Sequence, residues 1–245
     1  MARPNRPTTV KTPKSKAAKP PMSPLKAQLV AAAIAVGFIA LVVTIIITSN
    51  QARPVPDALP TVAPSDAGQL VRDDSHVITE ATPDSAEVVL VEFLDLQCPA
   101  CASSAPLVDE LAARYGDRLA IVQRHLPLTS IHRHAIDAAV AAEAAGQQGA
   151  WHDMATALFE SQSSWSASTT SQADTFRALA EELGLDMAAY DAAVADPATR
   201  ERVAIDAADA AALGLASTPS FILDGEVLQL SSFDELVVAV EAALS

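Results

Sequence analysis

The chain contains two cysteines, Cys98 and Cys101, and their position constrains its fold more than any other feature of the sequence. They follow an apolar segment at residues 87–94, EVVLVEFL, whose Val-rich run is typical of a strand covered on both faces. Beyond them, apolar residues recur at helical spacing as far as Tyr115, which predicts an amphipathic helix. The cysteines therefore lie where a buried strand passes into a helix.

The chain has no third cysteine, so any intramolecular disulfide joins Cys98 to Cys101. Closing so short a loop adds little stability, which favours a redox role over a structural one. An inert disulfide and a zinc site stay open as alternatives. Zinc would need further ligands from the five histidines, and His132 and His134 are two residues apart and would not share a helical face.

The predicted start of the helix decides the chemistry of the two sulfurs. Free amides and the helix dipole favour the thiolate of Cys98, and Pro99 suits the first helical position. A stabilised thiolate favours the reduced form, which makes the disulfide a better oxidant. Cys98, at the exposed edge, would form a mixed disulfide that Cys101, one turn deeper, resolves.

Glu92 interrupts the apolar strand six residues before Cys98. If it is buried, desolvation raises its pKa and lets it exchange protons with Cys101. The alternative is an ordinary acid at the solvated end of the strand.

The N-terminal part predicts a membrane anchor. Residues 1–26 carry seven Lys and Arg and no acid, and residues 29–47 form an uncharged apolar run. As a helix this run is about 28 Å long, enough to span a bilayer core. We expect a basic cytoplasmic tail at 1–26 and a transmembrane anchor at 27–48, with the rest of the chain extracytoplasmic. A cleaved signal peptide and a buried soluble helix are the alternatives.

Residues 49–68 contain four prolines and little apolar bulk, which predicts a disordered linker. From residue 51 onward there are nine Arg, no Lys and 30 acids, a balance of 9 − 30 = −21. This charge excludes nucleic acid as an expected partner. Outside the cytoplasm a disulfide persists, because that compartment is oxidising.

The rest of the chain predicts a small sheet and several helices. Strands are expected at 119–126, 220–223 and 226–230, with edge strands within 69–79. Asp224-Gly225 predicts a two-residue hairpin turn. Four or five short helices fit the Ala-rich residues 134–215, and Ser232 with Glu235 offers a capping box to a final helix. Pro106 predicts a kink or break in the helix after the cysteines.

Other polar and aromatic residues allow two interpretations. His125, His132 and His134 either face the cysteines and tune them or serve other contacts. Trp151 and the Ser163–Trp165 segment either line a substrate groove or pack a helical subdomain, and packing is favoured.

Together these motifs resemble the DsbA-like thiol:disulfide oxidoreductases, in the membrane-anchored form found in actinobacteria. The resemblance covers residues 69–245 and rests on three segments: VEFLDLQCPAC at 91–101, PLTSIHRHA at 127–135 and STPSFILDG at 217–225. It implies an α/β, thioredoxin-like fold with a helical insertion at about 131–215, preceded by one transmembrane helix and a Pro-rich linker.

The resemblance also implies roles for individual residues. Cys98 matches the nucleophile, Cys101 the resolving cysteine and Glu92 the upstream acid. Pro219, after Thr218, matches a cis-proline that faces the disulfide. An X-Pro bond adopts the cis form at modest cost. A cis bond would leave backbone groups of Thr218 free to pair with an extended substrate. The alternative is a trans proline that opens a strand.

The implied activity is the introduction of disulfides into unfolded secreted or envelope proteins, without cofactor or metal. Reoxidation would come from a quinone-coupled membrane partner, such as a VKOR-like protein. One departure weakens the oxidase expectation: the strongly oxidising members have Pro-His between the cysteines, whereas this chain has Pro99-Ala100. A reductase or isomerase of the same fold and a non-catalytic anchored binding module are the alternatives.

Overall fold

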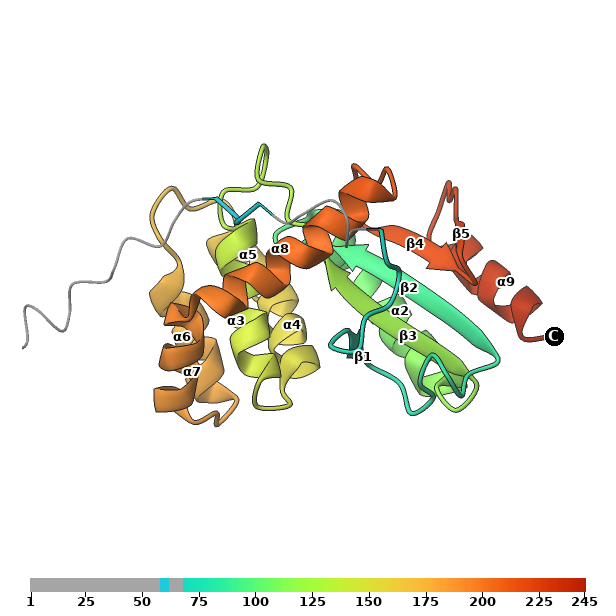
Figure 1. Ribbon diagram of the computed structural model, residues 1–245, viewed down its shortest axis with the longest axis horizontal. Helices are drawn as coiled ribbons and strands as arrows, with labels where there is room; N and C mark the ends of the chain where they lie inside the picture. The colour runs from blue at the N-terminus through green and yellow to red at the C-terminus, as the bar shows by residue number, and fades with distance from the viewer. Residues whose placement is uncertain (1–57, 62–67) are drawn as a thin grey trace, which may run out of the picture. The chain divides into compact units, whose positions relative to one another are not determined.

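The computed structural model describes residues 58–61 and 68–245 (Figure 1). The predicted cytoplasmic tail, the anchor at 27–48 and most of the linker lie outside these residues. Within the part described, no helix combines the length and the apolar character that crossing a membrane requires.

A mixed sheet of five strands forms the centre of the fold, in the order β1-β3-β2-β4-β5. The strands are β1 (His76–Val77), β2 (Val88–Leu94), β3 (Leu119–His125), β4 (Ser220–Leu223) and β5 (Glu226–Val227). β2 and β3 are parallel, and the other neighbours are antiparallel. The predicted strands are confirmed, except that β5 ends at Val227, which is exposed, instead of at residue 230.

Helices cover both faces of the sheet (Figure 1). On one face lie α2 (Pro99–Tyr115) and α9 (Asp234–Ala243), on the other α8 (Pro197–Ala212). Alternate residues of β2 supply the two cores: Leu90 packs with α2 and α9, and Val91 with Ala210 of α8. Burial on both faces explains the almost unbroken apolar sequence of the central strands.

Six helices separate β3 from β4, rather than the four or five expected. They are α3 (Ala135–Gly146), α4 (Trp151–Glu160), α5 (Gln162–Trp165), α6 (Ala173–Glu182), α7 (Met187–Ala195) and α8. The additional helix is α5, a single turn of four residues in a Ser-rich segment whose composition does not predict a helix. Trp165 is fully buried against Phe176, so packing rather than a groove is confirmed for this tryptophan.

Two local details differ from expectation. α2 does not break at Pro106 but continues to Tyr115, because Ser104 and Val108 on either side of the proline are fully buried and hold both halves of the helix. α9 begins at Asp234 without a capping box at Ser232. Glu235 instead accepts a hydrogen bond from the backbone N–H of Ser231 at 2.7 Å.

The predicted hairpin turn between β4 and β5 is confirmed. Asp224 and Gly225 both have positive φ, 47° and 88°, as a type I′ turn requires. The Asp224 carboxylate and backbone N–H also bond the backbone of Val89, each at 2.9 Å. The turn is therefore fixed to β2, the strand that leads to the cysteines.

Candidate active site

Cys98 is the N-cap of α2, four residues beyond the end of β2. Its extended backbone, with φ −74° and ψ 123°, turns the chain into the helix, and Pro99 occupies the first turn as predicted. The Cys98 N–H donates to the carbonyl of Asp95 at 2.9 Å, which closes the short loop between strand and helix. Cys98 keeps 7% of its surface exposed and Cys101 keeps 1%, so the first sulfur is the more accessible.

The surroundings of Cys98 stabilise its thiolate. A hydrogen bond from the Cys101 side chain is the largest influence, and it helps to lower the pKa of Cys98 to about 5. Burial acts in the opposite direction, but Thr218 and the backbone amides of Cys101 and Ala100 lower the pKa further. These are the free amides at the start of a helix that the sequence predicted would favour the anion.

The surroundings of Cys101 favour its thiol. Burial is the main cause that raises its pKa well above the ordinary value, and the hydrogen bond to Cys98 and the charge of Glu92 raise it further. The backbone N–H of Asp95 lies 3.5 Å from the sulfur and acts in the opposite direction. The fold therefore separates the ionisation of the two sulfurs widely.

Glu92 is buried on β2, with 1% of its surface exposed. Its Oε2 accepts a hydrogen bond from Nε2 of Gln123 at 2.7 Å, across the parallel pair of strands. Burial raises the pKa of Glu92 to about 7, although the Gln123 hydrogen bond lowers it. The alternative of a solvated acid is therefore wrong, and Glu92 can exchange a proton near neutral pH.

The Thr218–Pro219 peptide bond is cis. It directly precedes β4, which pairs antiparallel with β2 and places Ser220 opposite Phe93. This register brings the Thr218 carbonyl oxygen to 3.4 Å from Sγ of Cys98. Residues 120 positions apart in sequence thus meet at the sulfur.

Sequence reasoning missed Asp95, which lies three residues before Cys98 and is buried. Its carboxylate accepts hydrogen bonds from the backbone N–H groups of Gln97 and Leu128, both at 2.8 Å. It also pairs with Nδ1 of His132 at 2.7 Å. Because its own N–H faces the Cys101 sulfur, Asp95 positions the loop around the pair. The sequence signal that could have identified Asp95 is its position as an acid directly after an apolar strand.

The three histidines of residues 125–134 do not act together. His132 pairs with Asp95, whereas His125 bonds Glu143 at 2.9 Å. His134 bonds the backbone carbonyl of Ser168 at 2.9 Å. The His132 ring contacts the loop before the cysteines at Asp95, and the backbone N–H of His134 donates to Oε1 of Gln97 in the same loop at 2.6 Å.

The cysteines belong to no group of three or more potential metal ligands in the part of the chain that the structure describes. The zinc alternative at this pair therefore has no further ligands among those residues. One group of metal-ligand type is present, formed by His76, His125 and Glu143.

These features place two cysteines of unequal ionisation at the start of a helix that follows a buried strand of the sheet. The family model described as thioredoxin matches residues 83–242, and the chain belongs to this family. The match includes both cysteines, Glu92 and Pro219. The expected thioredoxin fold with a helical insertion is confirmed.

Solved structures of related folds agree. A thioredoxin-like oxidoreductase from Silicibacter pomeroyi DSS-3 is 26% identical, with a TM-score of 0.57 over 71% of this chain and 94% of that one. Wolbachia pipientis alpha-DsbA1 is 18% identical, with a TM-score of 0.58 over 71% of this chain and 92% of that one. Both likenesses support the expected thioredoxin-like fold.

One curated relative is a much longer protein. The Na(+)/H(+) antiporter NhaA 1 of Mycobacterium sp. strain KMS is 36% identical over 184 residues, which are 74% of this chain and 27% of the antiporter. The chain thus spans about a quarter of the length of such relatives.

Proposed function

We propose that the chain is an extracytoplasmic thiol:disulfide oxidoreductase that introduces disulfides into secreted or envelope proteins through Cys98 and Cys101. The observation that carries the proposal is the unequal ionisation of the two sulfurs, with the pKa of Cys98 lowered to about 5 and that of Cys101 raised. A thiolate at Cys98 is a stable leaving group, which favours passing the disulfide to another protein.

The exchange proceeds in two balanced steps from the Cys98–Cys101 disulfide. A substrate thiolate attacks Sγ of Cys98, the bond to Cys101 breaks, and Cys101 leaves as a thiolate that takes up a proton. A second substrate thiolate then attacks the substrate sulfur of the mixed disulfide, and Cys98 leaves as a thiolate. The substrate loses two electrons, and the cysteine pair gains them.

Glu92 serves as the proton donor to Cys101 in the first step, and as the acceptor when the pair is reoxidised. Its burial, its pKa of about 7 and its electrostatic influence on Cys101 support this role. A buried acid with a pKa near the working pH transfers protons efficiently in both directions.

The segment before β4 receives the substrate. The Thr218 carbonyl lies against Sγ of Cys98, and backbone groups at this position can pair with an extended chain by strand addition. Such pairing places a substrate cysteine beside the reactive sulfur without selecting a sequence, which suits unfolded proteins as substrates.

Location and reoxidation complete the proposal. The apolar run at 29–47, after a basic tail, supports an anchor at 27–48 with the catalytic domain outside the cytoplasm. A quinone-coupled membrane protein such as a VKOR-like enzyme would accept the two electrons. Antiport is not proposed, because the matched segment is a quarter of the relatives that carry that name.

The direct test is the redox equilibrium of the purified chain with glutathione. An oxidase requires a potential well above that of thioredoxin, about −270 mV. A value as low as thioredoxin's would overturn the oxidase proposal in favour of a reductase. Cys98→Ser should abolish disulfide transfer, whereas Cys101→Ser should accumulate mixed disulfides with substrate proteins. Thiol trapping in cells should find the pair oxidised.

A further inference from the structure

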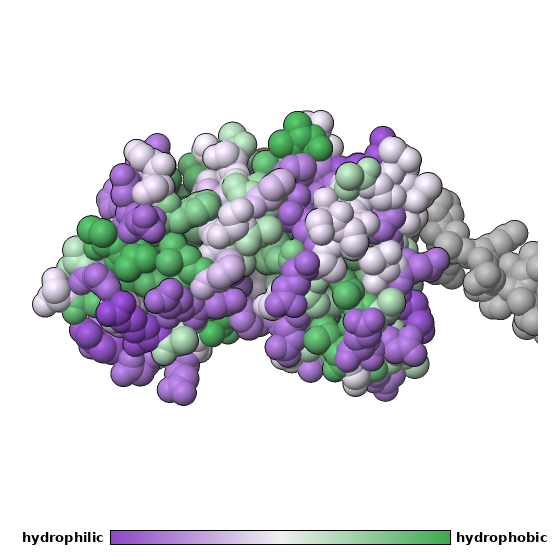
Figure 2. Space-filling view, turned by 180° about the vertical axis from the view of Figure 1, so that it is seen from behind, coloured by the Kyte–Doolittle hydropathy of each residue, from purple (hydrophilic) through white to green (hydrophobic). Residues whose placement is uncertain are grey.

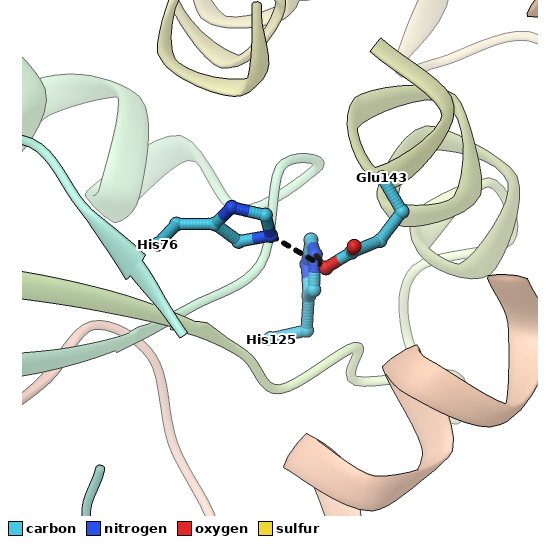
Figure 3. A group of neighbouring side chains, drawn as sticks. All are labelled: His76, His125 and Glu143. Carbon is cyan, nitrogen blue, oxygen red and sulfur yellow. Dashed lines mark hydrogen bonds and ion pairs between the residues drawn. The ribbon is translucent and has the colours of Figure 1, made fainter. Parts of the chain in front are cut away.

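Three potential metal ligands, none of them a cysteine, converge between the sheet and α3 (Figure 3). His76 comes from β1, His125 is the last residue of β3, and Glu143 lies in the last turn of α3. Nε2 of His76 and Nε2 of His125 lie 2.8 and 2.9 Å from the same oxygen, Oε1 of Glu143. The three ligand atoms all lie within 4.8 Å of one another.

We propose that His76, His125 and Glu143 bind one divalent first-row transition metal ion, with zinc as the favoured ion. Two imidazole nitrogens and one carboxylate oxygen form a zinc ligand set that leaves a fourth position for water. In tetrahedral geometry with bonds of about 2.1 Å, neighbouring ligand atoms are about 3.4 Å apart. Small shifts of side chains that already converge would therefore bring the three atoms into coordination.

The two rings are held in place by Trp151, the first residue of α4. The His76 ring stacks on the Trp151 ring, with centroids 4.5 Å apart and planes 15° apart. The His125 ring meets the same tryptophan edge-on at 5.8 Å. Because packing fixes both rings, binding an ion costs little side-chain entropy.

Gly146 provides the room for this stack. A Cβ at this position of α3 would lie 3.1 Å from Cε1 of His76 and 3.2 Å from Trp151. Those distances are closer than ordinary packing, so any larger residue would push the His76 ring away from Glu143. The helix backbone at Gly146 does not have positive φ, so space rather than conformation favours glycine here.

The charge of the site suits a cation. Glu143 supplies the carboxylate of the three ligands, and its Oε1 lies between the two imidazole nitrogens. Arg202 acts on Glu143 electrostatically and opposes a second cation. That arginine is itself paired with Asp74 at 2.8 Å and with Asp206, which limits its effect.

The competing interpretation is a hydrogen-bonded cluster without any ion, in which both histidines donate to Glu143.

One feature limits the affinity for zinc that we expect. Nδ1 of His125 is buried without a hydrogen-bond partner among the described residues. Zinc-bound histidines usually donate their second N–H to an acceptor, and loss of that acceptor weakens binding about 10- to 100-fold. A bound ion would join the helical insertion to β1 and β3.

The test uses the purified full-length chain with Cys98 and Cys101 oxidised to the disulfide, because free thiolates would bind zinc themselves. Equilibrium dialysis against zinc, followed by elemental analysis, should find one ion per chain. Cobalt should replace it and give the visible absorption of a tetrahedral site. If neither bound zinc nor the cobalt absorption is found, the proposal is wrong and the three residues form a hydrogen-bonded cluster without an ion.

Matched variants locate the ion. Glu143→Gln keeps the shape of the side chain and should weaken zinc binding at least about 10-fold, because a charged ligand is lost. His76→Gln should act similarly and, being on a two-residue edge strand, is the second variant if Glu143→Gln does not fold. The control is His152→Gln, an exposed histidine 3.5 Å from Asp109, which should bind zinc as the parent does. Equal binding by parent and Glu143→Gln, or an equal loss in His152→Gln, would refute the site.

Discussion

Glu92 and Gln123 face each other across β2 and β3 in a hydrogen bond that uses only half of the amide. Nε2 of Gln123 donates to Glu92 at 2.7 Å, while Oε1 of Gln123 is buried without a partner among the described residues. Protonation of Glu92 would supply an O–H group that can donate to this oxygen. The pair therefore accommodates both protonation states of Glu92, which agrees with its pKa of about 7.

Glu92→Gln should stabilise the protein at alkaline pH. The pKa of Glu92 is raised from 4.5 to about 7, so the folded state holds more protons than the unfolded state between these values. Stability falls as pH rises through this window, and the loss is complete above it. At pH 8 the variant should be more stable by up to about 3 kcal/mol, and at pH 4 the two proteins should differ little.

Urea unfolding of the oxidised proteins at both pH values measures this difference. The matched control is Glu110→Gln, an exposed acid on α2 whose removal should leave stability within about 0.5 kcal/mol at either pH. A Glu92→Gln variant no more stable than the parent at pH 8 would show that burial does not raise the pKa of Glu92.

Cys98 should ionise far below the ordinary pKa of a thiol. Thiolate absorbance at 240 nm, followed against pH in the reduced protein, should give a midpoint near the pKa of about 5. Cys101→Ala removes the largest stabilising hydrogen bond and should raise the midpoint by more than about one unit, short of the ordinary 9.0 because Thr218 and the helix amides persist. A parent midpoint close to 9.0 would contradict the ionised nucleophile.

The sequence was most informative where function depends on local structure. The strand, the cysteine pair and the start of the helix at Pro99 follow from periodicity and helix-end chemistry within 30 residues. The Asp224-Gly225 turn follows from its own dipeptide. Thr218 and Pro219 needed the family resemblance, because no local signal shows that β4 pairs with β2 and reaches the sulfur from 120 residues away.

Long-range polar contacts could not be predicted. Glu143 lies in an Ala-rich helix, 67 residues from His76 and 18 from His125, and only the packing of α3 on the sheet brings them together. The same holds for Asp95, whose partners Leu128 and His132 follow the next strand. Pro106 failed as a helix breaker because tertiary packing compensates for one missing hydrogen bond.

Asp95→Asn should destabilise the protein by about 2 to 4 kcal/mol, because buried donors lose a charged acceptor. The amide N–H₂ of asparagine would face either the Gln97 N–H or the Leu128 N–H, and neither can accept its protons. Urea unfolding measures the loss, and slower disulfide exchange should accompany it, since the loop around Cys98 is displaced. The control is Asp191→Asn. The pair of Asp191 with Arg177 is exposed, so this substitution should cost at most about 1 kcal/mol. Equal costs would show that Asp95 does not hold the loop.

Arg124 is the most consequential buried charge in the described fold, because it joins β3 to α8. Its side chain is completely buried, with Nε donating to Asp206 and Nη2 to Asp209, both at 2.6 Å. Arg124→Met fills a similar volume but removes one of two arginine partners from each carboxylate, since Asp206 keeps Arg202 and Asp209 keeps Arg72. The loss of these buried hydrogen bonds should cost about 3 kcal/mol. Arg114→Met is the control, since its pair with Glu241 at 3.2 Å is exposed and should contribute at most about 1 kcal/mol.

Urea unfolding of Arg124→Met and Arg114→Met measures the two costs. Equal costs would show that the buried arginine holds β3 to α8 no more strongly than an exposed ion pair would.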